Sequence, residues 1–441
     1  MARSDNVSLD ANHPTTLLLS AETAEALDAA TQKLAAWMSE KSQPGHAAWP
    51  LPEVAAALRE RCRMLPQRRA IRVESWQDAL AALDDKARWA TATALPGSPK
   101  LILSFPGQGS LRPGVLSRLL AGLPAWARHL RHYADLARDI SGFDCAGWLA
   151  DPRADADSVL RDNGKTQLAI FCVGAALGRW LLDLGPHPDG FLGHSLGEWM
   201  SANLAGVLTD EHAVRAVYHR GRLMQTTGPG AALIVRATPE ALQPQLPDDI
   251  TLACVNAPNL CLLSGRPEAV AICNEKLAAA RLITRPAPIH VAVHSPAMDA
   301  ILDPFLAELA PLDFAAPKNR LLSPVTGEWM PEALARDRAY WARQLRQPVR
   351  FDKAAATLLA EPSAVILEVG MGAALTSLIT TQTRGRSNLR ALALLGRDEP
   401  PAEGYAPARV HQTLGELWAA GVAVNLVGEA TNRHPLPGLP F

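Results

Sequence analysis

The stretch Gly193–Gly197, of sequence GHSLG, constrains the fold of this chain most strongly. It follows a short predicted strand at residues 189–192 and precedes a segment with apolar residues at helical spacing, at residues 198–208. A G-x-S-x-G pattern between a strand and a helix is typical of a sharp turn that exposes a serine hydroxyl. Free N–H groups at the start of the following helix can bind an oxyanion. The pattern predicts a nucleophile, Ser195, in an α/β fold, but it also arises by chance, so further features are needed.

A glycine-rich loop, Phe105–Gly109, is the second such feature. It follows the apolar run 101–105, which predicts a buried strand. Ligands of open α/β sheets gather at the carboxyl ends of strands. Because glycines permit close backbone approach, we predict that the N–H groups of Gln108 and Leu196 form an oxyanion hole. The loop lacks the third glycine of a dinucleotide site, and an ordinary glycine-rich turn is the alternative.

His294 and Arg220 are the candidate partners of Ser195. His294 ends an apolar run that Pro296 takes out of regular structure. A histidine at a strand end can serve a serine as general base, and we favour His294 over His290, which lies inside the predicted strand. Arg220 lies on a predicted helix, where it is either solvated or holds a substrate carboxylate with its planar fork.

Composition excludes several classes of protein. The 441 residues, 48% of them hydrophobic, suffice for two to four domains. A net charge of −1 argues against a nucleic-acid-binding or membrane-surface protein. No apolar run is long enough to span a membrane, and the polar N-terminus lacks a signal-peptide core. The six cysteines form no C-x-x-C pair, and no H-E-x-x-H motif or P-loop is present. We therefore expect a cytoplasmic protein with reduced thiols and no metal.

The motifs FPGQG, GHSLGE, RGRLMQ and VHSPAM occur in this order and closely resemble those of the malonyl-CoA:acyl carrier protein acyltransferase family. The resemblance is closest to the acyltransferase module of modular polyketide synthases, enzymes of secondary metabolism, and it extends over residues 15–441. Further segments that look like family signatures are 166–167, 256–258, 323–327, 340–351 and 368–370. It implies an α/β-hydrolase-like large subdomain with a parallel sheet, an inserted ferredoxin-like small subdomain and an N-terminal α/β linker domain.

The order of predicted elements agrees with that architecture. Residues 232–293 show the β-α-β-β-α-β order of a ferredoxin-like unit. The substrate cleft is expected between the subdomains, with Ser195 on the large one and His294 where the chain returns to it. The predicted parts are a flexible tail (1–14), the linker domain (15–98), the large subdomain in two parts (99–231 and 294–396), the small subdomain (232–293) and a post-acyltransferase linker (397–441).

The resemblance implies ping-pong acyl transfer. Ser195, deprotonated by His294, would attack the thioester of malonyl-CoA, and the phosphopantetheine thiol of an acyl carrier protein would then accept the acyl group. A backbone carbonyl is implied to orient His294, and we place it in the loop 368–370. Arg220 is implied to hold the malonyl carboxylate. No bound cofactor is expected. The expected partners are malonyl-CoA, a ketosynthase domain against the linkers, and a carrier protein, which is usually acidic and has a candidate docking group in Arg61, Arg63, Arg68 and Arg69.

Substrate selectivity stays open at this point. Leu196 after the nucleophile favours malonyl, as the family pattern implies. Residues 291–294, VAVH, match neither the HAFH pattern of malonyl enzymes nor the YASH pattern of methylmalonyl enzymes, so methylmalonyl-CoA is the alternative. The candidate pocket residues are Gln167, Trp199, Asn256, Val291 and Val293, with packing as the alternative role of Trp199. Two other functions remain: a serine acyl hydrolase, for which the expected acidic residue and HGGG loop are missing, and a non-catalytic docking scaffold.

Overall fold

The computed structural model describes residues 15–43, 49–107, 111–383, 386–396 and 404–426. A parallel five-stranded sheet lies at its centre, with the strand order β10-β5-β4-β12-β13. The middle strands are mostly apolar and are buried except at Lys100, the first residue of β4, as expected of a parallel sheet covered on both faces. The strands are β4 (Lys100–Phe105), β5 (Gly190–Gly193), β10 (Arg320–Leu322), β12 (Ala364–Glu368) and β13 (Leu389–Ala393).

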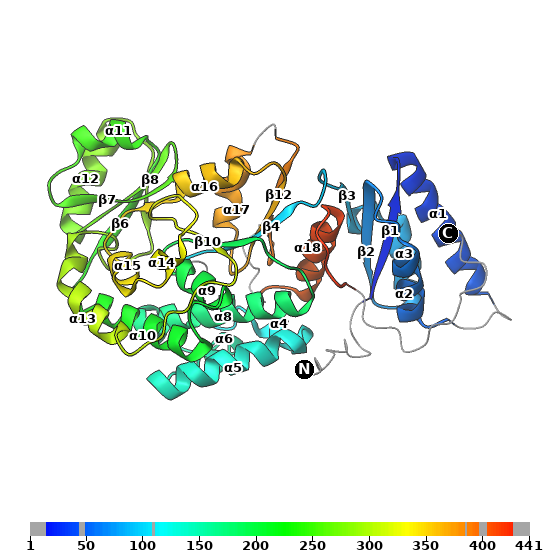
Figure 1. Cartoon of the computed structure of the whole chain (residues 1–441), viewed down its shortest axis with the longest axis horizontal. Coiled ribbons are helices and arrows are strands. Elements are labelled where there is room, and N and C mark those ends of the chain that lie inside the picture. Colours follow the sequence, from blue (N-terminus) through cyan, green and yellow to red (C-terminus); the bar gives the residue numbers. More distant parts are fainter. Residues whose placement is uncertain (1–14, 44–48, 108–110, 384–385, 397–403, 427–441) are drawn as a thin grey trace.

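Helices cover both faces of this sheet. In Figure 1, α4, α5, α6, α8, α9 and α10 form the layer below it, and α16 and α17 lie above. Helix α8 is buried on nearly all sides, which fits its apolar sequence and its place among other helices. The helices of the lower layer and its neighbours are α4 (Ser117–Gly122), α5 (Pro124–Ser141), α6 (Cys145–Ala150), α7 (Asp157–Leu160), α8 (Asn163–Asp183), α9 (Gly197–Leu204) and α10 (Asp210–Thr226). The later ones are α13 (Asp299–Leu309), α14 (Glu332–Ala335), α15 (Arg338–Arg343), α16 (Phe351–Leu359) and α17 (Ala374–Gln382).

A second, smaller sheet has the strand order β11-β7-β8-β6-β9. Its last four strands, with helices α11 and α12, have the predicted β-α-β-β-α-β order. An edge strand from outside the predicted unit, β11, pairs in parallel with β7, which the sequence analysis did not predict. The elements are β6 (Ala231–Val235), α11 (Pro239–Leu242), β7 (Ile250–Ala257), β8 (Leu260–Gly265), α12 (Pro267–Ala279), β9 (Thr284–Ala287) and β11 (Val349–Arg350). Together with the parallel sheet, this confirms the predicted fold class.

The N-terminal unit is an antiparallel sheet with helices against it. It contains β1 (Thr15–Ala21), α1 (Ala24–Lys41), α2 (Leu51–Arg61), β2 (Gln67–Val73), α3 (Trp76–Asp84) and β3 (Trp89–Thr93). Helix α18 (Pro407–Ala419) returns to this sheet and packs on β2 and β3, where Gly415 faces Ala70 and Ala90 (Figure 1). The predicted domain boundaries and the ketosynthase contact of this unit stay predictions. The predicted tail at 1–14 lies outside the described residues.

Two of the four arginines proposed as a docking group are buried in this unit. Arg68 lies under α18, where its guanidinium donates to the carbonyl of Trp418 at 3.3 Å and faces the indole ring. Arg69 binds Asp28 at 2.6 Å and stacks on Trp89. Because both side chains have partners inside the fold, the docking group as predicted is wrong.

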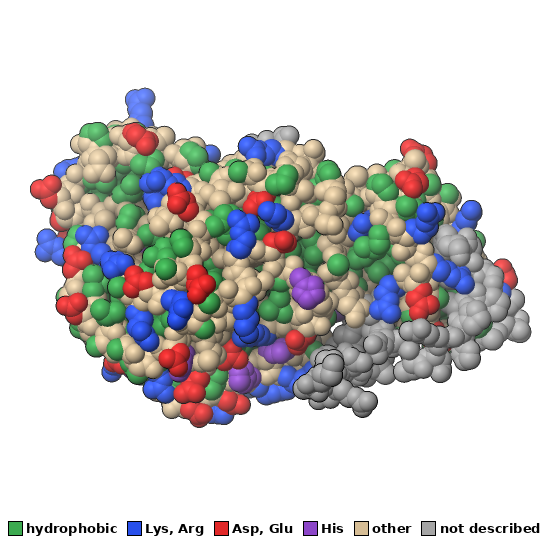
Figure 2. Space-filling model, in the orientation of Figure 1, with side chains coloured by type: hydrophobic (Ala, Val, Ile, Leu, Met, Phe, Trp, Pro, Cys, Tyr) green, Lys and Arg blue, Asp and Glu red, His purple; other side chains and the backbone are tan. Residues whose placement is uncertain are grey.

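The surface and the helices give two further findings. Figure 2 shows basic and acidic side chains interspersed on the face it presents. Within the described ranges, no helix combines the length and the apolarity needed to cross a membrane. In the same part of the chain, no cluster of three or more His, Cys, Asp or Glu is placed to hold a metal ion.

Candidate active site

Ser195 lies on the predicted turn between β5 and α9. Its φ of 53° is in the left-handed region, which non-glycine residues rarely adopt and which is common at functional turns. The flanking glycines are needed for space. A Cβ on Gly193 would lie 2.0 Å from the Glu198 nitrogen, and one on Gly197 would lie 2.0 Å from the Phe105 oxygen. The sequence therefore folds into a strained elbow that holds the serine hydroxyl clear of the sheet.

His294 lies within hydrogen-bond distance of this hydroxyl. The distance from Ser195 Oγ to His294 Nε2 is 2.8 Å, and the other ring nitrogen, Nδ1, lies 2.9 Å from the carbonyl oxygen of Gln347. Since a carbonyl only accepts, Nδ1 carries the proton and Nε2 is free to accept one from the serine. The orienting group is a backbone carbonyl, as the resemblance implied, but its predicted place in the loop 368–370 is wrong. Glu368 instead accepts the N–H groups of residues 375 and 376 at the start of α17.

The chain around His294 is not the predicted strand. Strand β9 ends at Ala287, and His290 is exposed outside regular structure. Pro286 and Pro288 offer no N–H groups for a ladder, which explains why pairing stops early. His294 is 2% exposed and has a φ of 50°, so a turn rather than a strand end presents its ring.

The environment keeps His294 neutral. Burial, helped by the positive charge of Arg220 and by His194, lowers the pKa of His294 to about 3. At neutral pH the imidazole is therefore an unprotonated base. Its direct hydrogen bonds are to a serine and a backbone carbonyl, and no described carboxylate bonds to it.

Arg220 reaches the same hydroxyl from α10. Its Nη2 donates to Ser195 Oγ at 3.2 Å and its Nη1 donates to Gln167 Oε1 at 2.6 Å. The side chain is 2% exposed, which excludes the solvated alternative. Burial lowers the pKa of Arg220 to about 10, so it stays charged at neutral pH. A buried cation is costly without an anion, so a carboxylate beside the nucleophile would be a favourable partner for Arg220.

The other predicted site residues make different kinds of contact in the structure. Gln167 bonds Arg220, as described above. Asn256, at the end of β7, accepts a hydrogen bond from His194 Nε2 through its Oδ1 at 2.8 Å. This bond links the small sheet to the elbow. Trp199 is fully buried against Phe305 and Trp341, which is the packing alternative. Val291 and Val293 are buried in the segment before His294.

The predicted oxyanion hole is described only in part. Gln108 lies outside the described residues. The loop before it does lie against the elbow, since a Cβ on Gly107 would be 3.1 Å from the His194 oxygen. The N–H of Leu196 stands at the start of α9 and forms no hydrogen bond with a described residue, so it is available to an oxyanion.

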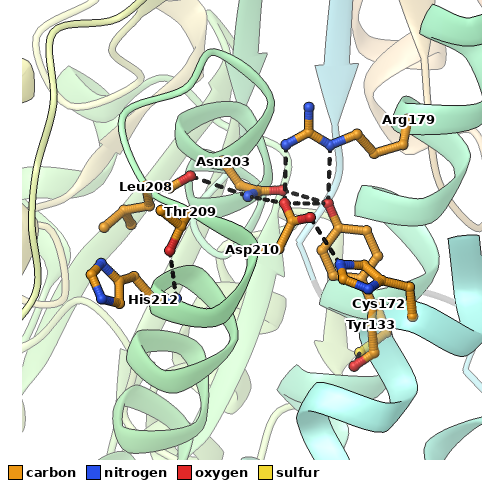
Figure 3. Close-up of polar contacts among 9 residues, drawn as sticks. Tyr133, Cys172, Arg179, Asn203, Leu208, Thr209, Asp210 and His212 are labelled. Carbon is orange, nitrogen blue, oxygen red and sulfur yellow. Dashed lines mark hydrogen bonds and ion pairs between the residues drawn. The ribbon is translucent and has the colours of Figure 1, made fainter. Parts of the chain in front are cut away.

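A polar network fixes the start of α10, the helix that carries Arg220 (Figure 3). At its centre, Asp210 Oδ1 accepts from Asn203 Nδ2 at 2.8 Å, from the Tyr133 hydroxyl at 2.9 Å and from Arg179 Nη2 at 3.0 Å. Partial burial pushes the pKa of Asp210 upward, but the hydrogen bond from Asn203 and the charge of Arg179 outweigh it and lower this pKa to about 2. The network joins α5, α8, the end of α9 and α10.

Asp210→Asn is expected to lower the free energy of unfolding by about 2 kcal/mol, because it removes the charge that three donors share, two of them on buried residues. Since the pKa is depressed in the folded state, this contribution is fully present above about pH 4 and is lost as pH falls through about 2. Urea unfolding at neutral pH measures it. Asp139→Asn, an exposed change on α5, is the control, and equal midpoints for both variants would contradict the prediction.

Sequence reasoning gave no role to four residues of the site, although they lie in the motif GHSLGE or the signature 340–351: Glu198, Tyr340, Gln344 and Gln347. Glu198 is 2% exposed, and its Oε1 accepts the Tyr340 hydroxyl. Gln344 Nε2 donates to the Ser195 carbonyl at 2.8 Å. A signal for Glu198 was present, since it is an acidic residue in the apolar segment 198–208.

Relatives of this chain are found among polyketide synthases. The model of the acyl transferase domain family matches residues 103–424. A phenolphthiocerol/phthiocerol polyketide synthase of Mycobacterium tuberculosis is 31% identical over 97% of this chain, which covers 29% of that protein. Mycoketide-CoA synthase of the same organism is 32% identical over 77% of this chain, which covers 8% of it. The chain thus spans less than a third of the length of these relatives.

Solved structures of similar fold point the same way. The acyl transferase domain of SpnD, in complex with 2-(pent-4-yn-1-yl)malonyl, has a TM-score of 0.84 and 28% identity, with 94% of this chain and 98% of that one covered. The acyltransferase domain from module 8 of the salinomycin polyketide synthase has a TM-score of 0.83 and 26% identity, with 94% and 97% covered. Because one continuous family match spans the elbow, the histidine and the arginine, this chain belongs to the acyl transferase domain family and is an acyltransferase of the polyketide synthase type.

Proposed function

We propose that this domain loads a malonyl group from malonyl-CoA onto the phosphopantetheine thiol of an acyl carrier protein, through an acyl-Ser195 intermediate. One observation carries the proposal. A buried guanidinium, Arg220, and a neutral imidazole, His294, both lie within hydrogen-bond distance of Ser195 Oγ. Such a site favours an acyl group that ends in a carboxylate.

The steps follow from these positions. His294 Nε2 takes the hydroxyl proton as Ser195 Oγ attacks the thioester carbonyl, and the carbonyl of Gln347 stabilises the imidazolium that forms. The N–H of Leu196, with that of Gln108, would hold the oxyanion. The proton passes to the leaving CoA thiolate. In the second half, His294 deprotonates the carrier thiol, which attacks the acyl-serine ester. As the Ser195 ester bond breaks, the proton passes from His294 to Ser195 Oγ. No bound cofactor takes part.

Malonyl is the proposed acyl group. Leu196 follows the serine and Val293 precedes the histidine, and both are buried and apolar, so Arg220 is the charged partner that we propose for a substrate. A malonyl-type ligand in the related SpnD domain supports a substrate of this class. Discrimination against an added methyl is worth only about 1–3 kcal/mol, so the choice over methylmalonyl must be measured.

Intact-protein mass spectrometry after brief incubation with equimolar malonyl-, methylmalonyl- and acetyl-CoA tests this proposal. We expect mainly the malonyl adduct. A dominant methylmalonyl adduct would keep the mechanism and overturn the substrate. Free acid released without transfer to a carrier protein would favour a hydrolase, and no adduct or turnover would favour a docking scaffold.

An open groove of about 330 Å³ lies between the small sheet and α17. Asn256 bonds His194 beside the nucleophile, and the next residue, Ala257, already lines the groove. Arg236 and Arg285 line it as well, and neither forms an ion pair with a residue in the described ranges. We propose that they bind the phosphate that CoA and the phosphopantetheine arm share.

Arg236→Ala with Arg285→Ala is therefore expected to raise KM for malonyl-CoA about tenfold and to leave the rate of acylation at saturation unchanged. Added salt should reduce the difference, because the charges are exposed. Lys276→Ala, on the helix that covers the opposite face of the small sheet, is the control. An unchanged KM in the double variant would refute the phosphate contact.

A further inference from the structure

The hydrogen-bond network around Glu198 has buried acceptor atoms without donors. Its Oε1 accepts the Tyr340 hydroxyl, which lies 2.7 Å from Ser323 Oγ. Its Oε2 is buried and receives no donor from the described residues. The side-chain oxygen of Gln344, Oε1, is buried and without a donor in the same way. Two buried acceptors without a donor in one cluster are unusual and costly.

The orientation of the Gln344 amide is fixed by its other contact. Its Nε2 donates to the Ser195 carbonyl at 2.8 Å, and turning the amide over would place oxygen against oxygen. The Gln344 side chain also lies close enough to influence the Glu198 carboxyl. A hydrogen on Glu198 Oε2 would supply a donor to this cluster, where the nearby Gln344 amide has an oxygen that lacks one.

We infer that Glu198 keeps its proton at neutral pH and acts as a neutral hydrogen-bond donor, which positions Gln344 and, through it, the peptide of Ser195. The proposed chain of hydrogen bonds runs from Ser323 through Tyr340, Glu198 and Gln344 to the Ser195 carbonyl at the elbow. Glu198 is thus a positioning residue. Its effect on malonyl loading rests on the proposed function, whereas its protonation state does not.

A neutral Glu198 also does not offset the positive charge of Arg220, which can then attract the substrate carboxylate. The ionisable groups that act on Glu198 are Tyr340 from α15 and Arg220 from α10. Burial raises the pKa of Glu198 to about 8, although Tyr340, Gln344 and Arg220 each pull it down. An ionised Glu198 would offset Arg220 and repel an incoming carboxylate. Malonyl binding should therefore weaken as pH rises through about 8.

Infrared difference spectroscopy tests the inference directly. The wild type minus Glu198→Gln should show the carbonyl stretch of a protonated carboxyl group at pH 7, and this band should disappear as pH rises past about 8. Tyr340→Phe removes the donor to Oε1 and should shift the band, which identifies it even if Glu198→Gln fails to fold. Absence of the band at pH 7 would overturn the inference.

Kinetics give an independent readout. Glutamine mimics the neutral acid, because its amide donates where the proton would lie and its oxygen accepts from Tyr340. Glu198→Gln should keep kcat/KM for malonyl-CoA within about threefold at pH 7 and should lose the alkaline decline of the wild type between pH 7 and 9. A hundredfold loss of kcat/KM at pH 7 would show that the reaction needs the ionised carboxylate of Glu198 and would overturn the inference. If neither the wild type nor the Glu198→Gln variant loads malonyl, the proposed function fails. The infrared band still decides the protonation state of Glu198.

Discussion

Ser195→Ala is expected to abolish the acyl-enzyme adduct, and His294→Ala to slow its formation about 10³-fold, since general-base catalysis contributes typically 10² to 10⁴. The reason is geometric, because Nε2 of His294 is the acceptor at 2.8 Å from the serine hydroxyl. Rapid-quench mass spectrometry with malonyl-CoA measures the rate of adduct formation. His290→Ala, an exposed histidine four residues away, is the matched control.

The pH profile of the same reaction checks the state of the base. With a pKa of about 3, His294 stays unprotonated across the acidic range, so adduct formation in the wild type should hold its rate from pH 7 down to about pH 4. An exposed histidine, with a pKa near 6.5, would lose most of its activity there. A decline centred near pH 6.5, or equal losses in the His290 and His294 variants, would contradict this assignment.

Arg220→Ala should lower kcat/KM for malonyl-CoA by about 10² to 10⁴ and leave acetyl-CoA nearly unaffected, because two charge-assisted hydrogen bonds of about 1.5–3 kcal/mol each are lost only with the carboxylate substrate. Arg220→Lys should recover part of the loss, since an ammonium keeps the charge but not the fork. Competition between the two thioesters gives the ratio in a single experiment.

The control for this prediction lies on the same helix. Arg222 is exposed and pairs with Glu308 at 3.1 Å, away from the serine, so Arg222→Ala should leave the malonyl-to-acetyl ratio unchanged. Equal losses with malonyl-CoA and acetyl-CoA in Arg220→Ala would mean that Arg220 supports the elbow rather than the carboxylate.

Sequence reasoning located the features that local pattern determines. The elbow at Ser195 needs glycines on both sides and a strand and helix around it, all of which lie within a dozen residues. The β-α-β-β-α-β order of the small unit is likewise a matter of sequential elements. Arg220 lies 25 positions from Ser195, and only the family motif, not helical periodicity, indicated that it faces inward.

The missed features depend on contacts between distant segments. The carbonyl of Gln347 reaches His294 because β11 and the turn before it pack against the small sheet, and no residue type marks a carbonyl. The side chain of Glu198 is buried and accepts a hydrogen bond from Tyr340, which lies 142 positions away. The strand predicted before His294 does not form, and the reason is local. Prolines at 286 and 288 have no N–H groups to donate to a neighbouring strand.

The packing of α18 on the first sheet has a consequence for synthesis. Strands β2 and β3 form early in the chain, but the helix that covers their second face ends at residue 419. On the ribosome, that face stays uncovered until more than 300 further residues have been made, as the spacing from Thr93 to Pro407 requires. Contacts this distant in sequence form slowly. This unit is therefore completed only after the two larger sheets that follow it have been made, and during that interval its apolar face is open to chaperones.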